Sequence, residues 1–174
     1  MKIRKAESGD IDRIEEIYDR IHDEEESGAA TIGWIRGIYP VRKTAEDSLA
    51  RGDLFVMEDK GVILGTAIIN QIQVPDYAFA KWKHEAEDHE VMVLHTLIID
   101  PLRKAKGYGK TFIAFYEDYA REHGCSELRI DTNARNTRAR EMYRKLGYEE
   151  IDIVPCEFNG IPGVRLVCLE KYLG

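Results

Sequence analysis

Apolar, mostly branched side chains run from Val91 to Ile99, and only His95 and Thr96 interrupt them. A run of this length and composition predicts a strand that is buried on both faces. Pro101 follows and ends the strand, because proline cannot donate to a sheet ladder. From Tyr108 onward the apolar positions take helical spacing, so the pattern predicts a strand, a turn and a helix in that order.

The same periodicity predicts the elements on either side of this unit. We expect helices at residues 11–26, from Thr44 to Arg51 and after Asn136, where Thr44 and Asp47 open the second helix as a capping box. We expect strands around Ile3 and at residues 54–58, 62–71, 128–132, 149–158 and 164–171. This order predicts an α/β protein with a mixed sheet, helices on both faces and the 91–99 strand at its centre.

The polar connection at residues 74–89 carries the aromatic side chains of Tyr77, Phe79 and Trp82. Aromatic side chains in a connection indicate packing, so we expect a lid or a pocket wall there. The sequence contains no repeat, low-complexity segment or linker, and 174 residues suit one core. We therefore expect residues 1–174 to form a single domain.

Composition narrows the classes of function. The net charge of -7 argues against a nucleic-acid partner. The chain shows neither an N-terminal secretion signal nor an apolar run of membrane-spanning length, so we expect a cytoplasmic protein without a membrane partner. Three cysteines predict no disulfide framework, and five histidines without zinc-ligand spacing predict no metal.

The turn at residues 103–110 is basic and contains two glycines. The first turn of a helix leaves backbone N–H groups unpaired and carries the positive end of the helix dipole. Glycine lets this backbone approach a ligand closely. A phosphate or pyrophosphate is therefore the expected guest of the turn.

Two familiar phosphate motifs fit the turn incompletely. Gly109-Lys110-Thr111 matches the end of a Walker A loop, but Lys104 stands where its first glycine is required. A G-x-G-x-x-G fingerprint begins at Gly107 and Gly109, but Phe112 occupies its last position. A nucleotide-phosphate enzyme nevertheless remains one alternative function.

A third motif fits better. Lys104-x-x-Gly107-x-Gly109, directly after the strand, resembles the Q/R-x-x-G-x-G/A motif of the GNAT-type (Gcn5-related) N-acetyltransferases, with lysine in the first position. The segment Asn136-x-x-Ala139-x-x-x-Tyr143-x-Lys145-x-Gly147-Tyr148 is similar to a second segment of that family. The two motifs stand in the family's order, and the resemblance covers essentially the whole chain.

The resemblance implies the acyltransferase fold of that family, a mostly antiparallel sheet with one splayed parallel strand pair. It also implies that acetyl-coenzyme A binds with its pyrophosphate on the glycine turn and its pantetheine along the open strand edge. The cofactor contacts implied in this way are Leu97, Ile98, Ile99, Lys104, Ala105, Lys106, Gly107, Tyr108, Gly109, Lys110 and Asn136.

The implied reaction is attack of an amine on the thioester. Tyr143 holds the position that supplies a proton to the leaving thiolate in many members of the family; its alternative is a core aromatic. His95 is the candidate base because histidine titrates near neutral pH, and its alternative is a buried histidine bonded to backbone. Strict strand alternation places His95 and Leu97 on one face, an expectation that a bulge between them would break.

Trp34, Tyr39 and Trp82 are the candidate walls of the acceptor pocket, because the resemblance places them in segments that vary with substrate; the alternative for each is ordinary packing. The expected acceptor is a primary amine of a small molecule or peptide. Alternatives are acetylation of a protein N-terminus or lysine, and a non-catalytic acyl-coenzyme A sensor. In many relatives the last two strands build dimers, so the resemblance allows a homodimer.

Overall fold

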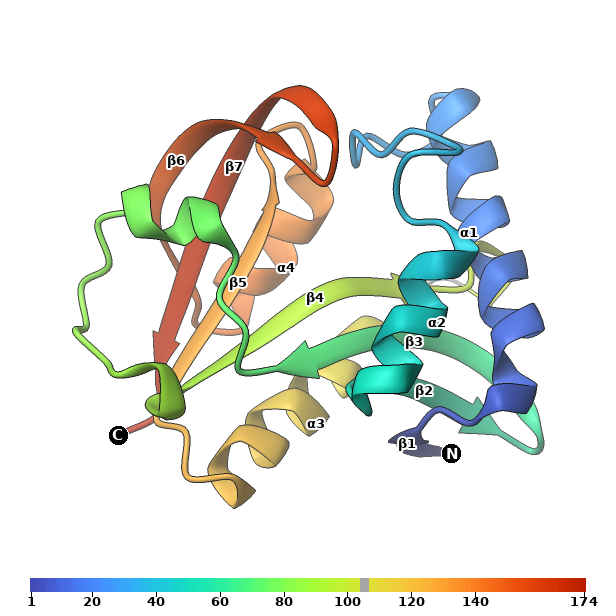
Figure 1. Cartoon of the computed structure of the whole chain (residues 1–174), viewed down its shortest axis with the longest axis horizontal. Coiled ribbons are helices and arrows are strands. Elements are labelled where there is room, and N and C mark those ends of the chain that lie inside the picture. The colour runs from blue at the N-terminus through green and yellow to red at the C-terminus, as the bar shows by residue number, and fades with distance from the viewer. Residues whose placement is uncertain (104–106) are drawn as a thin grey trace.

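The computed structural model describes residues 1–103 and 107–174 and contains a seven-stranded sheet of order β1-β2-β3-β4-β5-β7-β6. Its strands are β1 (Lys2–Lys5), β2 (Leu54–Asp59), β3 (Val62–Asn70), β4 (Val91–Ile99), β5 (Glu127–Asn133), β6 (Glu149–Phe158) and β7 (Ile161–Tyr172). Only the β4–β5 pair is parallel among these strands. The predicted mixed sheet with the 91–99 strand at its centre is confirmed (Figure 1).

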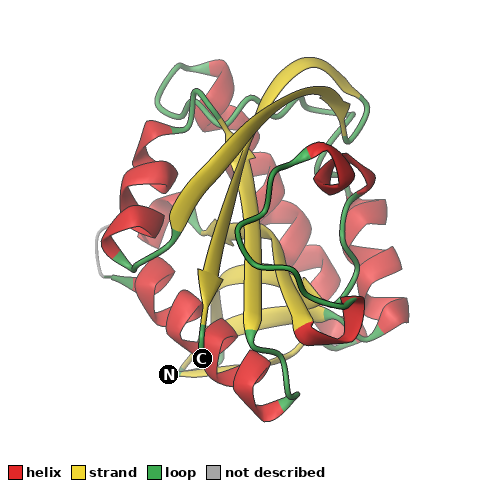
Figure 2. Ribbon diagram, turned by 90° about the vertical axis from the view of Figure 1, so that its left-hand side faces the viewer, coloured by secondary structure: helices red, strands yellow, loops and turns green. Residues whose placement is uncertain are grey.

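Helices cover both faces of the sheet, as the sequence predicts (Figure 2). They are α1 (Ile11–Glu26), α2 (Arg42–Arg51), α3 (Tyr108–Glu122) and α4 (Thr137–Lys145). Within the part of the chain that the structure describes, none of them has the length and apolar character needed to cross a bilayer.

The core has three parts. Helices α3 and α4 bury Phe112, Tyr116 and Tyr143 on one face of the sheet. Helices α1 and α2 pack on the other face, where α1 buries Ile14 and Tyr18. A third cluster lies between the 74–90 connection and strands β6 and β7. Because all three clusters contain residues of β4, this strand is the common support of the fold.

Two predicted boundaries are wrong for local reasons. Helix α2 begins at Arg42, so Thr44 lies inside its first turn, and its hydroxyl accepts a hydrogen bond from Val41 N at 3.0 Å. Strand β7 begins at the Ile161 end of a two-residue turn formed by Asn159 and Gly160, whose φ angles are 52° and 76°. Asparagine followed by glycine favours this tight hairpin turn, which leaves no longer loop between the strands.

Asp100 ties α1 to the end of β4. Its carboxylate is fully buried and accepts hydrogen bonds from Arg13, from Arg20 Nη1 at 2.8 Å and from Leu102 N at 3.0 Å. Burial would raise the pKa of Asp100, but these donors outweigh it and hold the pKa below its usual range. The interaction fixes the chain where β4 gives way to the glycine turn.

Replacing Asp100 with alanine should lower the free energy of unfolding by about 3 kcal/mol, because it leaves two arginines beside an apolar gap without their shared partner. Urea unfolding at neutral pH measures the change. The matched control is Asp118→Ala, since Asp118 pairs with Arg121 at 2.9 Å on the exposed surface of α3, and such pairs contribute about 0–1 kcal/mol. Equal losses in the two variants would contradict the role of Asp100.

Candidate active site

Strands β4 and β5 pair over a short distance and then diverge. Their parallel register runs from Val91 opposite Glu127 to Leu94 opposite Ile130. Beyond Leu94, β4 stays paired with β3 on one side, whereas β5 pairs with β7 up to Asn133 (Figure 1). The backbone of β4 from His95 onward therefore faces a gap, and the predicted splay of the sheet is confirmed.

A bulge in β4 lies where the divergence begins. Ile68 pairs with His95 and Thr66 with Ile98, so β4 carries one residue more than β3 over this interval. Thr96 takes the left-handed conformation, with φ of 51°, and its hydroxyl hydrogen-bonds the hydroxyl of Tyr39. An extra residue reverses the alternation of side chains in a strand.

The bulge corrects the expectation that His95 and Leu97 share a face. Leu97 packs with the α3 cluster, on the same face as Leu94. His95 instead reaches Asn70 on the other face of the sheet. The sequence could not show this, because neither a glycine nor a proline marks the bulged position.

A cavity of about 510 Å³ occupies the gap between β4 and β5. Its walls come from both diverging strands, the first turn of α3, helix α4, residues 29–34 and the β6–β7 hairpin. This arrangement brings together most of the predicted site. The predicted residues that line it are Trp34, His95, Leu97, Ile99, Gly107, Tyr108, Gly109, Lys110, Asn136 and Tyr143.

Some predicted contacts are absent from this lining. The side chain of Ile98 is buried in the α1 cluster, so Ile98 can meet a ligand only through its backbone. Trp82 packs edge-on against Tyr77 and beneath the guanidinium of Arg129 instead of lining the cavity. Lys104, Ala105 and Lys106 lie outside the described residues.

The N-terminus of α3 fits an anionic group. Gly107 is the N-cap with φ of 76°, and within the described residues no side chain caps the helix. The N–H groups of the first turn are therefore left for a ligand. At Gly109 a Cβ atom would stand 3.2 Å from Met142 Sδ, which shows how closely α3 approaches α4. The pyrophosphate cradle at this helix end stays a prediction, and the geometry of Gly107 and Gly109 is compatible with it.

Tyr143 extends from α4 into the cavity and is only 6% exposed. Burial, and then the nearby Asp131 carboxyl, raise the pKa of Tyr143, so the phenol is protonated at neutral pH. Its hydroxyl bonds to no other residue that the structure describes. A protonated and unengaged phenol can donate a hydrogen bond or a proton to a ligand in the cavity.

Asp131 in β5 is a site residue that sequence reasoning missed. It lines the cavity and accepts a hydrogen bond from Tyr77 Oη at 2.7 Å. Burial raises the pKa of Asp131 to about 7, although the Tyr77 hydrogen bond lowers it. A signal was present, because Arg129, Asp131 and Asn133 form a polar face on a strand whose other face is apolar.

His95 belongs to a polar chain at the rim of the cavity. Asn70 donates to Asp53 Oδ2 at 2.8 Å and accepts through Oδ1 from Ile72 N, so its amide orientation is fixed. His95 Nε2, 2.9 Å from the same Oδ1, therefore carries the proton, and Nδ1 keeps the lone pair. Burial lowers the pKa of His95 to about 4, so the ring is neutral at neutral pH.

Comparison with known proteins identifies the family. Residues 12–148 match the model of the acetyltransferase (GNAT) family. This match covers most of the chain, and the protein therefore belongs to the GNAT family of N-acetyltransferases. The enzyme class and the resemblance given by the two sequence motifs are thereby confirmed.

Individual relatives agree with this assignment. The uncharacterized N-acetyltransferase YhfO of Bacillus subtilis is 23% identical over 150 residues, which cover 86% of this chain and 91% of YhfO. A GNAT-family acetyltransferase structure from Streptococcus agalactiae superposes with a TM-score of 0.80 at 24% identity, covering 98% of this chain and 94% of that one. The structure of yncA, a putative acetyltransferase from Salmonella typhimurium with its cofactor acetyl-CoA, superposes with a TM-score of 0.68 at 19% identity. The superposition covers 100% of this chain and 94% of yncA.

Asn136 holds the start of α4, the helix that carries Tyr143. Its side chain accepts a hydrogen bond from Ala139 N at 3.2 Å and donates to Thr132 Oγ1 at 3.2 Å. Replacing Asn136 with alanine should therefore lower the free energy of unfolding by about 1 kcal/mol through loss of the cap. Urea unfolding measures the loss. Asn136→Ser keeps a capping oxygen and should recover most of it, and an equal loss in both variants would contradict the capping role.

Proposed function

We propose that this protein transfers an acetyl group from acetyl-coenzyme A to the primary amine of a small molecule or peptide. One observation carries the proposal: a single cavity joins the open edge of β4, the free N-terminus of α3 and the side chains of Tyr143 and Asp131. The first two features suit an extended thioester cofactor with a diphosphate, and the last two suit proton transfer.

Different groups of the described residues would bind the pantetheine and the pyrophosphate of the cofactor. The backbone at Leu97, Ile98 and Ile99 would pair with the pantetheine amides, and the first-turn N–H groups of residues 107–110 would hold the pyrophosphate. The cofactor supplies an acetyl group activated as a thioester. Asn136, whose amide already caps α4, would contact the cofactor from the opposite wall of the cavity.

The chemistry requires one proton acceptor and one proton donor. The amine nitrogen forms a bond to the acetyl carbon, the carbon–sulfur bond breaks, and the sulfur leaves as a thiolate. A base takes the proton lost from the amine, and the Tyr143 phenol protonates the thiolate sulfur. Tyr143 suits the acid role because its pKa is raised and its hydroxyl is unengaged among the described residues.

Asp131 and His95 are the two candidate bases. A base works best when its pKa lies near the working pH. The pKa of Asp131 is raised to about 7 and that of His95 is lowered to about 4. We therefore assign the proton-accepting role to Asp131, and His95 stays the alternative.

The shape of the cavity favours a small acceptor. Trp34 stands edge-on to Tyr39 with ring centroids 5.9 Å apart, and both line the cavity. Phe158 and Asn159, at the tip of the β6–β7 hairpin, line it as well. Walls on these sides suit a small amine or the end of a peptide better than a lysine on a folded surface. Strand β6 is an edge of the sheet, and the predicted homodimer would form through it.

Thiol release from acetyl-coenzyme A, measured against a panel of amines, polyamines, amino acids and peptides, tests the proposal. The wild type should turn over at least one class of amine. Tyr143→Phe should lower kcat by about 10²–10⁴-fold, the usual contribution of a general acid, and should leave coenzyme A binding measured by calorimetry unchanged.

The matched control is Tyr119→Phe, which removes a phenol hydroxyl from a half-buried residue of α3 that does not line the cavity, and this variant should keep full activity. Binding of acetyl-coenzyme A without turnover of any amine would favour the non-catalytic sensor instead. Binding of ATP without coenzyme A would favour the nucleotide enzyme.

The pH dependence separates the two candidate bases. If Asp131 is the base, kcat/KM should rise with pH through an apparent pKa of about 7, because only the ionised carboxylate accepts a proton. Tyr77→Phe removes the hydrogen bond that lowers the pKa of Asp131, so this limb should move to higher pH. Asp131→Asn should abolish it, whereas His95→Ala should leave it in place. A limb that persists in Asp131→Asn and disappears in His95→Ala would reverse the assignment.

A further inference from the structure

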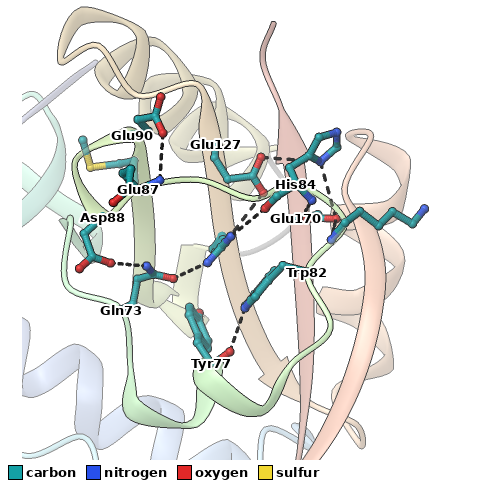
Figure 3. Close-up of polar contacts among 12 residues, drawn as sticks. Gln73, Tyr77, Trp82, His84, Glu87, Asp88, Glu90, Glu127 and Glu170 are labelled. Carbon is teal, nitrogen blue, oxygen red and sulfur yellow. Dashed lines mark hydrogen bonds and ion pairs between the residues drawn. The ribbon is translucent and has the colours of Figure 1, made fainter.

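Three side chains from distant segments meet at the end of β5 that lies away from the cavity. Glu127 opens β5, Glu170 lies near the end of β7, and His84 lies on the connection between β3 and β4. Figure 3 shows the imidazole of His84 reaching both carboxylates from the outer side. Sequence spacing could not reveal this group, because each member belongs to a different element.

The geometry of the three side chains is that of a set of metal ligands. His84 Nδ1 lies 3.8 Å from Glu127 Oε2 and 3.7 Å from Glu170 Oε1. One donor atom from each residue lies within 4.8 Å of the others. Donor atoms around a tetrahedral Zn²⁺ stand about 3.3 Å apart, given metal–ligand bonds of about 2.0–2.2 Å. The two separations from His84 Nδ1 therefore need to contract by only a few tenths of an ångström.

The two carboxylates are buried, and that of Glu127 lacks donors. The side chain of Glu127 is 1% exposed, and neither of its carboxylate oxygens has a hydrogen-bond partner among the described residues. Glu170 is 2% exposed, and its two oxygens accept from Lys83 N at 2.9 Å and from His84 N at 3.5 Å. A buried carboxylate without donors is costly, so a group that is absent from the protein chain itself is expected beside Glu127.

Among the described residues, the cations near Glu127 bond to other partners or lie beyond hydrogen-bond distance of it. Arg129 Nε lies 3.9 Å from Glu127 Oε1, too far for a hydrogen bond. The two terminal nitrogens of Arg129 donate elsewhere, to Gln73 Oε1 and to His84 O. The ammonium of Lys83 pairs with Glu149 on the surface. One guanidinium thus faces two buried carboxylates at the point to which His84 Nδ1 is directed.

We propose that His84, Glu127 and Glu170 bind a divalent transition-metal ion, for which Zn²⁺ is the best match. One imidazole nitrogen and two carboxylate oxygens form a donor set that Zn²⁺ accepts, and a water molecule completes four ligands. His84 is 44% exposed, which provides an entry path for the ion and room for the water. This site differs from the prediction of no metal, which rested on spacing along the chain.

The ion would anchor the 74–90 connection to the sheet. His84 stacks on Tyr172 with ring centroids 4.8 Å apart, so the imidazole is already held near its position. Two residues earlier, Trp82 Nε1 donates to Tyr77 O at 2.9 Å, and Tyr77 Oη donates to Asp131 in the cavity. Metal binding at one end of β5 therefore steadies the segment whose tyrosine touches the cavity carboxylate.

Calorimetric titration of the chelator-treated full chain with Zn²⁺ tests the site. The wild type should bind one ion per chain, and His84→Ala and Glu127→Gln should each weaken binding at least tenfold. Glu127→Gln keeps the shape of a buried side chain and removes its charge, so this variant should remain folded, as circular dichroism will show. His89→Ala removes an exposed histidine of the same connection and should bind like the wild type.

Two further measurements guard against weak surface binding. Co²⁺ should give a visible absorption band in the wild type and in His89→Ala, and the band should be absent in His84→Ala. Zn²⁺ should also slow hydrogen exchange of the backbone at residues 80–90 in the wild type. Absence of stoichiometric binding, or equal affinity in Glu127→Gln, would overturn the site and leave a proton shared by Glu127 and Glu170 as the occupant.

Discussion

The parallel pairing of β4 with β5 ends at Leu94, and the candidate site depends on that ending. Hydrogen bonds that would have continued the ladder are left open along one side of β4. The bulge at Thr96 maintains the gap, because it moves the following residues out of register with their predecessors. Leu97 and Ile99 thereby line the cavity, while Ile98 closes the core beneath α1.

Charge is placed unevenly around this gap. On the side of α1, Asp100 is buried with two arginines and a backbone donor, so its pKa falls. Inside the gap, Asp131 is buried with one phenol as donor, so its pKa rises to about 7. The same residue type is thus a structural anchor in one place and the proposed proton acceptor in the other, and the number of donors around it makes the difference.

Local signals in the sequence account for much of this structure. The apolar run to Ile99, the glycine turn and the helix that follows are neighbours in the chain, so composition alone predicts their order. Tyr143 could be found because it lies at a fixed distance from Asn136 in one helix.

The remaining features depend on distant contacts. Thr96 adopts its unusual φ beside the hydroxyl of Tyr39, and no residue type at that position indicates it. Burial raises the pKa of Asp131, and the phenol that donates to its carboxylate comes from Tyr77 in the distant 74–90 connection. The wall position expected for Trp82 rested on its occurrence in that connection, whereas its indole is held by Tyr77 and Arg129.

One contact at the end of β5 bears on how the two diverging strands, β4 and β5, are held relative to each other. The backbone of Gly33 lies so close to Asn133 that a Cβ atom there would stand 2.5 Å from Asn133 Nδ2, and Thr31 donates to Arg135 O at 3.0 Å. Glu25 of α1 accepts hydrogen bonds from Ile32 N at 2.7 Å and from Gly33 N at 3.1 Å, so this segment links α1 to the end of β5. A larger residue in place of Gly33 would have to displace the Asn133 amide and would also strain its own backbone, whose φ is 85°.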